Sequence, residues 1–364
     1  MYDYLIVGSG LFGSTFASLA KSAGKTCLVL EKRNHIGGNI YTENMDGINV
    51  HMYGPHIFHT SNKQTWDYVN KFVEFNSFIN RPKVNHKSKI YSFPINLFTL
   101  YQLWGVSTPT EARKKLASVK VPIKNPSNLE EWILSEVGEE IYQTFIYGYT
   151  KKQWGTDPKN LPTFIIKRLP IRLNFDDNYF TDAYQGIPIG GYTKLIKNML
   201  TDTPVETNID FNKDREYWTS KAKMVVYTGA IDELLNYTLG TLDYRSLKFV
   251  HQKLDVDDYQ GNAVVNYTEE HIPQTRIIEH KHFENVSVNS TIITKEMPDT
   301  WSMNKEKYYP INNERNNNLY DKYNEFMKKE YPNFMLGGRL ACYKYFDMHQ
   351  VIGQAMHKFQ TQSC

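Results

Sequence analysis

The sequence of 364 residues predicts an α/β protein with a parallel-sheet domain, an inserted helical domain and an antiparallel-sheet domain. Three observations support this class. A short apolar run leads into the glycine-rich residues 8–13, residues 95–165 have mainly helical patterns, and residues 243–300 contain four strand-like runs. A chain of this length exceeds one typical domain, so several domains are expected.

The N-terminal segment has the order of elements of a Rossmann-like unit. Its glycines have the spacing G-x-G-x-x-G: Gly8, Gly10 and Gly13. Such glycines allow a tight turn, close approach of a pyrophosphate and close helix–strand packing. Residues 14–24 then predict a helix, residues 26–30 a buried strand, and Glu31 the carboxylate that binds a ribose. A βαβ unit whose glycines only make a turn is the alternative, and the order of the elements favours a cofactor site.

Two further glycine pairs indicate that the dinucleotide is FAD. Gly37 and Gly38 follow Glu31 closely, and flavoproteins with a Rossmann unit place such a pair against the cofactor. Residues 334–341 read as a strand that runs into another glycine pair and Arg339. A helix whose capping residues are Asp347 and Gln350 follows.

The same patterns divide the chain into three predicted domains. The FAD-binding domain is discontinuous and comprises residues 1–78, 192–240 and 325–364. The helical domain comprises residues 95–165, and the antiparallel sheet comprises residues 79–94, 166–191 and 241–324. Residues 223–229 are expected to resume the parallel sheet after the insertion.

Within the helical domain, two capping boxes and one apolar face predict specific helices. Thr108 with Glu111, and Ser127 with Glu130, each have the spacing of a capping box. Four apolar residues then recur every four positions and predict one buried helix face: Ile133, Val137, Ile141 and Phe145.

Composition excludes several classes of function. The net charge is only +3, and the sequence lacks a long basic run and an apolar run of 18 residues. Nucleic-acid binding and a membrane span are therefore not expected. The three cysteines are far apart, which argues against a disulfide framework or a metal site and fits a reducing cytoplasm. Asp3 and the glycines argue against a signal peptide.

Several polar and aromatic residues are candidates for the active site. His56 and His59 lie beside the predicted cofactor site without an obvious third metal ligand, so we expect them to line it. The aromatic and polar residues 145–155 are typical of a surface that stacks on a planar base.

Arginines in two segments are candidates for binding phosphates. Arg168 and Arg172 flank Pro170 in a segment that either closes over a ligand or is a solvated loop paired with acidic residues. Alternation places Arg276 on the same strand face as Ile278 and His280, where burial is costly unless an anion meets the guanidinium.

These features together resemble the prokaryotic UDP-galactopyranose mutase family. The motifs that carry the resemblance span nearly the whole chain in the family's order: Asp3–Gly13, Glu31–Asn39, Gly54–Thr60, Gly148–Gly155, Lys167–Tyr179, Thr275–Phe283 and Gly337–Met348.

The resemblance implies an FAD enzyme that interconverts UDP-galactopyranose and UDP-galactofuranose without net redox change. In the family, N5 of the reduced flavin attacks the anomeric carbon and displaces UDP. NAD(P)H or another donor is the implied reductant, the product supplies cell-surface polysaccharide, and a homodimer is the implied assembly.

The resemblance also implies roles for individual residues. Arg168 and Arg276, with His56 and His59, take the catalytic roles, and both arginines also bind the diphosphate. The other substrate contacts are Asn80, Phe145, Ile146, Tyr149, Thr150, Trp154, Tyr179, Asn266, Tyr309, Tyr345 and Asp347. The FAD contacts are Gly8, Gly10, Leu11, Phe12, Gly13, Glu31, Lys32, Gly38, Asn39, His56, Ile57, Gly229, Arg339, Tyr345, Asp347 and Met348.

Three alternatives remain open at this point. A flavin oxidase of the amine-oxidase type would share the first 40 residues and the C-terminal glycine pair. A non-enzyme could use the same scaffold for binding. A mutase could also act on UDP-N-acetylgalactosamine, because one or two pocket residues decide such a preference.

Overall fold

The computed structural model describes residues 1–163 and 171–362 and divides into two compact units. The first unit comprises Met1–Ser77, Asp182–Ser246 and Trp301–Cys364. The second unit comprises Phe78–Thr181 and Leu247–Thr300.

A five-stranded sheet forms the centre of the first unit. Its strand order is β16-β10-β1-β2-β9, with every recorded pairing parallel. The strands are β1 (Tyr2–Val7), β2 (Cys27–Leu30), β9 (Val205–Glu206), β10 (Ala222–Tyr227) and β16 (Phe334–Leu336). The fold class and the return of the chain at residues 223–229 are thus confirmed.

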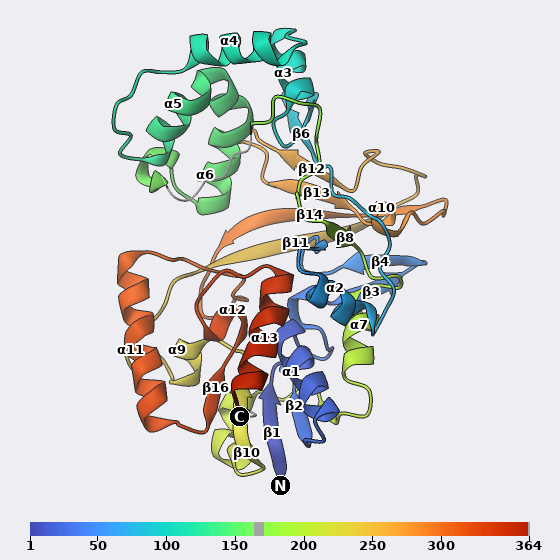
Figure 1. Cartoon of the computed structure of the whole chain (residues 1–364), viewed down its shortest axis with the longest axis vertical. Helices are drawn as coiled ribbons and strands as arrows, with labels where there is room; N and C mark the ends of the chain where they lie inside the picture. Colours follow the sequence, from blue (N-terminus) through green and yellow to red (C-terminus); the bar gives the residue numbers. More distant parts are fainter. Residues whose placement is uncertain (164–170, 363–364) are drawn as a thin grey trace. The chain divides into compact units, whose positions relative to one another are not determined.

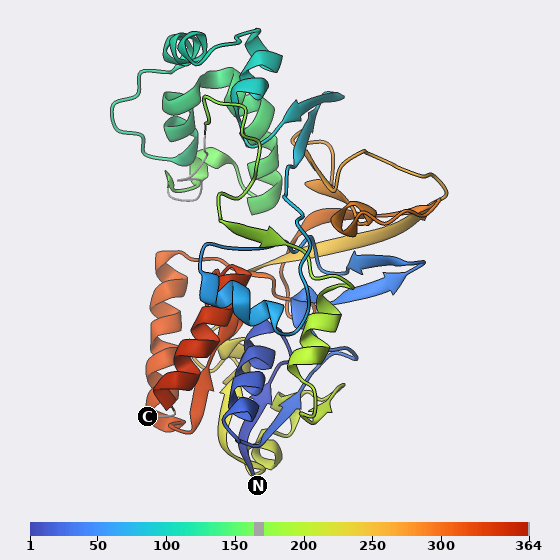
Figure 2. The same ribbon diagram turned by 45° about the vertical axis from the view of Figure 1, so that its right-hand side comes forward.

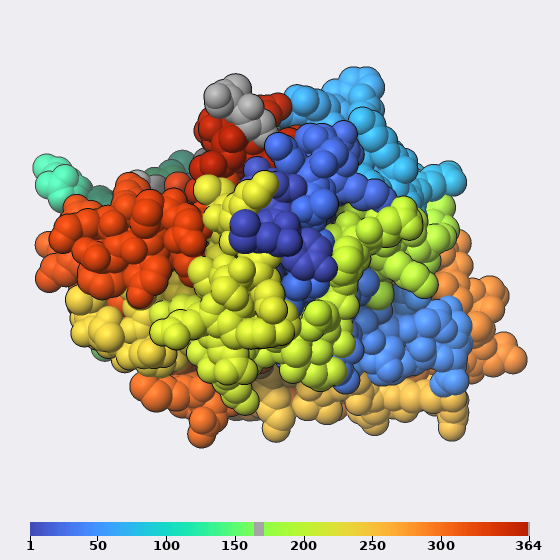
Figure 3. All heavy atoms as spheres, turned by 90° about the horizontal axis from the view of Figure 1, so that it is seen from below, coloured from blue at the N-terminus to red at the C-terminus, as the bar shows by residue number. Residues whose placement is uncertain are grey.

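Burial explains why these strands lie in the middle of the unit. Leu5, Ile6, Val225 and Val226 are fully buried, as expected for parallel strands that are covered on both faces. Helices α1 (Leu11–Ser22) and α13 (Met348–Gln362) pack against each other beside the sheet (Figures 1 and 2). Figure 3 shows segments from the N-terminus, the middle and the C-terminus of the chain adjoining on one face of this unit.

The remaining elements of the first unit are short except for α11, which has 17 residues. Its other helices are α2 (Lys63–Asn70), α7 (Tyr192–Met199), α8 (Arg215–Thr219), α9 (Ile231–Leu234), α11 (Glu314–Glu330) and α12 (Gly338–Ala341). Its other strands are β3 (Thr42–Met45), β4 (Ile48–His51), β5 (Phe58–Thr60), β8 (Tyr184–Gly186) and β15 (Tyr309–Pro310). The long strand β11 (Tyr244–Leu254) begins in this unit and continues into the second one.

The second unit contains a sheet and a group of helices. Its strands are β6 (Lys83–His86), β7 (Lys89–Ser92), β12 (Val264–Tyr267), β13 (Arg276–Glu279) and β14 (Thr291–Thr300). They follow β11 in the order β14-β13-β12-β6-β7. Most pairs are antiparallel as predicted, but β6 pairs with β12 in parallel, so the sheet is mixed.

The helices within residues 97–154 lie together beside β6 and β7 (Figures 1 and 2). They are α3 (Leu97–Trp104), α4 (Pro109–Val119), α5 (Leu129–Ile141), the π-helical turn Tyr142–Tyr147 and α6 (Gly148–Trp154), with α10 (Lys281–Glu284) following β13. The predicted apolar face is confirmed, because Ile133, Val137, Ile141 and Phe145 are all buried in one core.

Two local predictions need correction. The capping box of Thr108 and Glu111 is present, but the second helix is capped by Asn128, and Glu131 bonds back to Ser127. The pattern that predicts one helix also passes over Gly138, where φ is 77° and ψ is 175°. A side chain at Gly138 would meet the carbonyl of Val119, so the glycine allows the helix to break there.

The three predicted domains also differ from the two units. Residues 301–324, predicted to belong to the antiparallel sheet, lie in the first unit. Packing gives the reason, since Tyr323 and Met327 of α11 join the core of the parallel sheet.

Candidate active site

A cavity in the first unit gathers residues from several separated segments. The turn after β1, the residues after β2, Gly229 after β10 and the residues after β16 all contribute to its lining. The predicted FAD contacts that line it are Gly8, Gly10, Leu11, Phe12, Gly13, Glu31, Lys32, Gly38, Asn39, His56, Gly229, Arg339 and Met348. The cavity therefore lies at the carboxyl ends of parallel strands, where such folds bind ligands.

The glycine turn fits a dinucleotide. Gly8 has a φ of 104°, and a Cβ on Gly13 would overlap the carbonyl oxygen of Gly8. A Cβ on Gly38 would come within 3.1 Å of Cα of Gly10, so the two glycine segments pass each other closely beside the cavity. At these glycines the backbone faces the cavity without side chains. Helix α1 begins beside the cavity, so its N-terminal N–H groups lie where pyrophosphate binding requires them.

Glu31 is buried at the end of β2, as the ribose-binding prediction requires. Its Oε2 accepts hydrogen bonds from the backbone N–H of Ser9 at 3.0 Å and from the Ser9 hydroxyl at 2.6 Å. Its Oε1 accepts one from the backbone N–H of Arg33 at 3.0 Å. A carboxylate can accept about four hydrogen bonds, so Glu31 retains capacity for a ligand hydroxyl.

Sequence reasoning missed the charged residues at the edge of the same cavity. Arg33 lies 2.9 Å from Glu306 and 4.4 Å over the ring of Tyr53. Lys307 lies 2.6 Å from Glu233. Arg33 follows Glu31 by two positions, so the motif that contains Glu31 could have identified it. The loop around Lys307 has no local sequence pattern that would identify that lysine.

Glu233 is the acidic centre of this edge, since Lys32 also lies 3.2 Å from it. Burial opposes its ionisation, but the hydrogen bond and charge of Lys307 together with Lys32 keep the pKa of Glu233 below its usual value. The negative charge of Glu233 therefore offsets part of the positive charge that Lys32 and Lys307 bring to the cavity edge.

Three predicted FAD contacts, Ile57, Tyr345 and Asp347, are not among the lining residues. Tyr345 instead stacks on Tyr309 with ring centroids 6.0 Å apart, and the guanidinium of Arg339 lies 4.7 Å above the Tyr345 ring. Tyr345 is 53 % exposed, so one aromatic surface beside Arg339 is open to a ligand.

The histidines predicted beside the cofactor differ in their surroundings. His56 lines the cavity, and its Nδ1 lies 2.8 Å from the carbonyl of Gly54. His59 is buried, with Nδ1 at 2.7 Å from Asp182, a residue that the sequence did not single out. Burial raises the pKa of Asp182, but the hydrogen bonds from His59 and Ser61 lower it, and the net shift is downward.

His59 also lies close to the predicted residue Asp347 and to His349, which the sequence did not single out. Its ring centroid is 5.2 Å from that of His349, and His59, His349 and Asp347 each offer a ligand atom within 4.8 Å of the others. The structure thus brings His59 and Asp347 together, although they are far apart in sequence.

In the second unit, Arg276 and Asn266 are direct neighbours across β12 and β13. Arg276 lies opposite Glu296 of β14, and its guanidinium is 2.9 Å from the buried Glu296 carboxylate. The anion that the sequence argument required is therefore supplied by the protein itself. A guanidinium has five N–H donors and can bind more than one anion.

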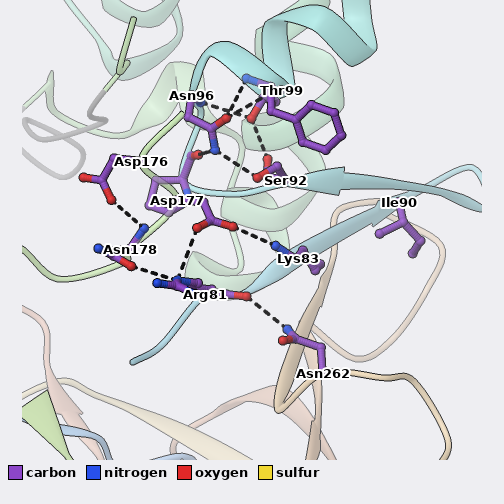
Figure 4. Close-up of polar contacts among 12 residues, drawn as sticks. Arg81, Lys83, Ile90, Ser92, Asn96, Thr99, Asp176, Asp177, Asn178 and Asn262 are labelled. Carbon is purple, nitrogen blue, oxygen red and sulfur yellow. Dashed lines mark hydrogen bonds and ion pairs between the residues drawn. The ribbon is translucent and has the colours of Figure 1, made fainter. Parts of the chain in front are cut away.

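Asn80 and Tyr179 are joined through the backbone, since the N–H of Tyr179 donates to the carbonyl of Asn80 at 2.8 Å. Figure 4 shows a polar cluster of residues that neighbour them in sequence, among them Arg81, Asp177 and Asn178. Asp177 bridges Lys83 at 3.0 Å and Arg81 at 3.4 Å, so it ties β6 to the segment that carries Tyr179. Of the predicted loop pairs, Arg172 lies 3.2 Å from Asp176, whereas Asp177 pairs with Arg81 and Lys83 rather than with a loop arginine.

The aromatic segment 145–155 is divided between core and surface. Phe145 and Ile146 are only 3 % and 4 % exposed, and Phe145 packs against Tyr91 and Phe93. Thr150 is buried, whereas Tyr149 and Trp154 on α6 are partly exposed. The uridine contact of Phe145 and Ile146 stays a prediction, and Arg168 lies outside the described residues.

Comparisons with known proteins agree with this arrangement. The profile of the family described as UDP-galactopyranose mutase matches residues 144–345, and that of an NAD(P)-binding Rossmann-like domain matches residues 6–72. Within residues 1–163 and 171–362, no helix combines the length and hydropathy that crossing a membrane requires.

Relatives match over nearly their full length. A dTDP-fucopyranose mutase of Escherichia coli is 42% identical over 98% of this chain and 97% of its own. A probable UDP-galactopyranose mutase of Klebsiella pneumoniae is 38% identical over 97% of this chain and 93% of its own. A crystal structure of reduced UDP-galactopyranose mutase shares the fold with a TM-score of 0.76 at 14% identity, covering 100% of this chain and 96% of that one. The chain therefore belongs to the UDP-galactopyranose mutase family.

Proposed function

We propose that this protein is an FAD-dependent isomerase that interconverts UDP-galactopyranose and UDP-galactofuranose. The observation that carries the proposal is its full-length similarity to mutases of two nucleotide-linked sugars. The predicted FAD contacts that gather around one cavity support the cofactor assignment. An amine-oxidase-type reaction has weaker support, because a putrescine oxidase shares only the fold, with a TM-score of 0.57 at 10% identity.

The reaction requires a leaving group that departs and returns. When bound, reduced FAD supplies the nucleophile for the anomeric carbon. Arg276 and Arg168 are proposed to bind the diphosphate and to stabilise the charge that develops as UDP leaves. Asn80, Tyr179 and Asn266 are proposed to orient the sugar, and the stacked rings of Tyr309 and Tyr345 to exclude water from it.

His59 has a proposed role as an orienting group. The Nδ1–H of His59 donates a hydrogen bond to the carboxylate of Asp182. This bond fixes the imidazole tautomer in which Nε2 is the acceptor. Such an acceptor can bind a sugar hydroxyl without donating a proton to it.

A second substrate, dTDP-fucopyranose, is favoured by the 42% identity to the mutase of that sugar. Both substrates are pyranoses attached to a pyrimidine nucleoside diphosphate, and the same phosphate contacts serve either. The sugar and the base therefore decide the preference, and UDP-N-acetylgalactosamine is a third candidate.

The test is a chromatographic assay with each sugar nucleotide, run with oxidised and with dithionite-reduced enzyme side by side. The proposal expects yellow protein with flavin absorbance and turnover of UDP-galactofuranose only after reduction. The ratio of kcat/KM between the UDP-linked and dTDP-linked sugars then assigns the preferred substrate. Bleaching of the flavin by an amine, with every sugar nucleotide unchanged, would refute the mutase reaction.

The same preparation tests the remaining proposals. NAD(P)H should replace dithionite as reductant, and sedimentation should give the mass of a homodimer. We further propose a cytoplasmic location and a role in supplying galactofuranose for cell-surface polysaccharide.

A further inference from the structure

A lysine on α6 occupies a cage of backbone carbonyls in the second unit. Nζ of Lys152 donates hydrogen bonds to the carbonyl oxygens of Tyr267 at 2.8 Å, Gln274 at 2.9 Å and Ile272 at 3.0 Å. An ammonium has three N–H donors, and the cage uses all three. Ile272 and Gln274 lie in the turn that connects β12 with β13, and Tyr267 is the last residue of β12.

The surroundings of this lysine form a close contact between α6 and that turn. A Cβ on Gly148, one helical turn before Lys152, would overlap the carbonyl oxygen of Thr268, so only glycine lets α6 approach so closely. Lys151 adds an exposed ion pair with Glu270 at 2.7 Å. The helix therefore contacts this region at three residues, Gly148, Lys151 and Lys152.

The two joined segments carry candidate substrate residues. Tyr149 and Trp154 lie on α6 on either side of Lys152, and Arg276 begins β13 two residues after Gln274. Their separation depends on how firmly α6 is held against the turn. A displacement of one ångström in such groups costs much of their effect on a bound ligand.

We propose that Lys152 is a positioning residue that locks α6 to the β12–β13 turn and so holds the α6 aromatic residues and Arg276 in register for a nucleoside diphosphate. This inference rests on the proposed function. The three hydrogen bonds of Lys152 go to backbone carbonyls, so its proposed contribution is to geometry rather than to chemistry.

The charge of Lys152 provides a readout that a purely structural lysine would not give. Desolvation lowers the pKa of Lys152 to about 8, and the charge of Glu269 opposes this only partly. A neutral amine has two N–H donors, so one of the three carbonyls loses its partner. The turn should then loosen between pH 7 and pH 9.

Other groups near the cage keep their charge over this range. Hydrogen bonds with Glu270 and Tyr147 raise the pKa of Lys151. Desolvation lowers the pKa of His86, which bonds to Thr268, so this imidazole stays neutral. The carboxylates of Glu269 and Glu270, the exposed His271 and the phenols of Tyr147 and Tyr267 are further titratable neighbours.

The experiment measures the dissociation constant of UDP by calorimetry at pH 7, 8 and 9 for the FAD-loaded wild type, K152R, K152M and K151M. For wild type we expect UDP affinity to fall at least about 5-fold between pH 7 and 9. K152R keeps its charge and should show a smaller fall. K152M should bind UDP at least about 10-fold more weakly at pH 7, the size of one lost charge-assisted hydrogen bond. K151M, which loses the ion pair with Glu270 and the hydrogen bond to Tyr147 but keeps the carbonyl cage, should follow the wild-type profile.

The outcomes separate the inference from the proposed function. Failure of wild-type protein to bind UDP or dTDP at any pH would overturn the proposed function and the inference together. Wild-type binding that is independent of pH from 7 to 9, or a K152R profile equal to that of wild type, would overturn the inference alone. This comparison holds even if K152M fails to fold.

Discussion

Replacing Arg276 with methionine separates the structural and the functional contributions of one side chain. The guanidinium lies 2.9 Å from Glu296, which is only 1 % exposed. R276M leaves a buried carboxylate without its cation, and breaking such a pair costs about 3 kcal/mol. We expect the melting temperature to fall by roughly 5 °C for a chain of this size.

The double variant R276M/E296Q should recover most of that loss, because a neutral amide removes the unpaired charge. Its turnover should stay low, since the diphosphate still lacks its cation. Losing one charge-assisted phosphate contact costs about 2–4 kcal/mol, or about 30- to 1000-fold in kcat/KM. Thermal unfolding and the chromatographic mutase assay measure the two effects on the same samples, with flavin absorbance as a control for FAD binding. A double variant that regains both stability and turnover would refute the assignment of Arg276 to the diphosphate.

Three further predictions concern other parts of the molecule. G13A should abolish FAD binding or folding because its Cβ overlaps backbone, whereas G353A, which meets no atom within 4 Å, should gain up to about 1 kcal/mol in unfolding free energy. D182N should lower the melting temperature at pH 7 but not below about pH 4. The depressed pKa of Asp182 contributes stability above its unfolded pKa, and this contribution is lost as pH falls. A difference in melting temperature between D182N and wild type that stays constant with pH would contradict this. D177N should raise KM by about 2- to 5-fold with little change in melting temperature, as expected for a partly exposed pair with Lys83, and an unchanged KM would reject its positioning role.

The fold could be predicted where the sequence pattern is local. The glycines at 8–13, the buried strands and the apolar helix face of residues 133–145 follow from spacing and periodicity alone. The predicted cap, Ser127, lies one residue before the observed cap, Asn128. The segment offers two overlapping capping patterns, Ser127 with Glu130 and Asn128 with Glu131. The break at Gly138 depends on a contact with Val119, which periodicity cannot reveal.

The candidate site divides in the same way. Its glycine segments and Glu31 belong to recognisable motifs, and they line the cavity as expected. Asp182, Glu296 and Lys307 act through partners that are distant in the sequence, so only the fold brings them to His59, Arg276 and the cavity edge. The carbonyl cage of Lys152 is likewise invisible in the sequence, because its three acceptors are backbone atoms.

The strand order of the first unit has a consequence for synthesis on the ribosome. β1 pairs on one side with β2, which follows at once, and on the other side with β10, which begins at Ala222. At about 5–20 residues per second, β10 is made roughly 10–40 s after β1.

During that interval the inner edge of β1 has no strand to pair with, although its Leu5 and Ile6 are fully buried in the finished core. An unpaired apolar edge is a site of aggregation. The nascent chain therefore passes through a stage in which the nucleotide-binding segment is complete in sequence but not in structure. A fragment that ends before β10 should need a chaperone to stay in solution.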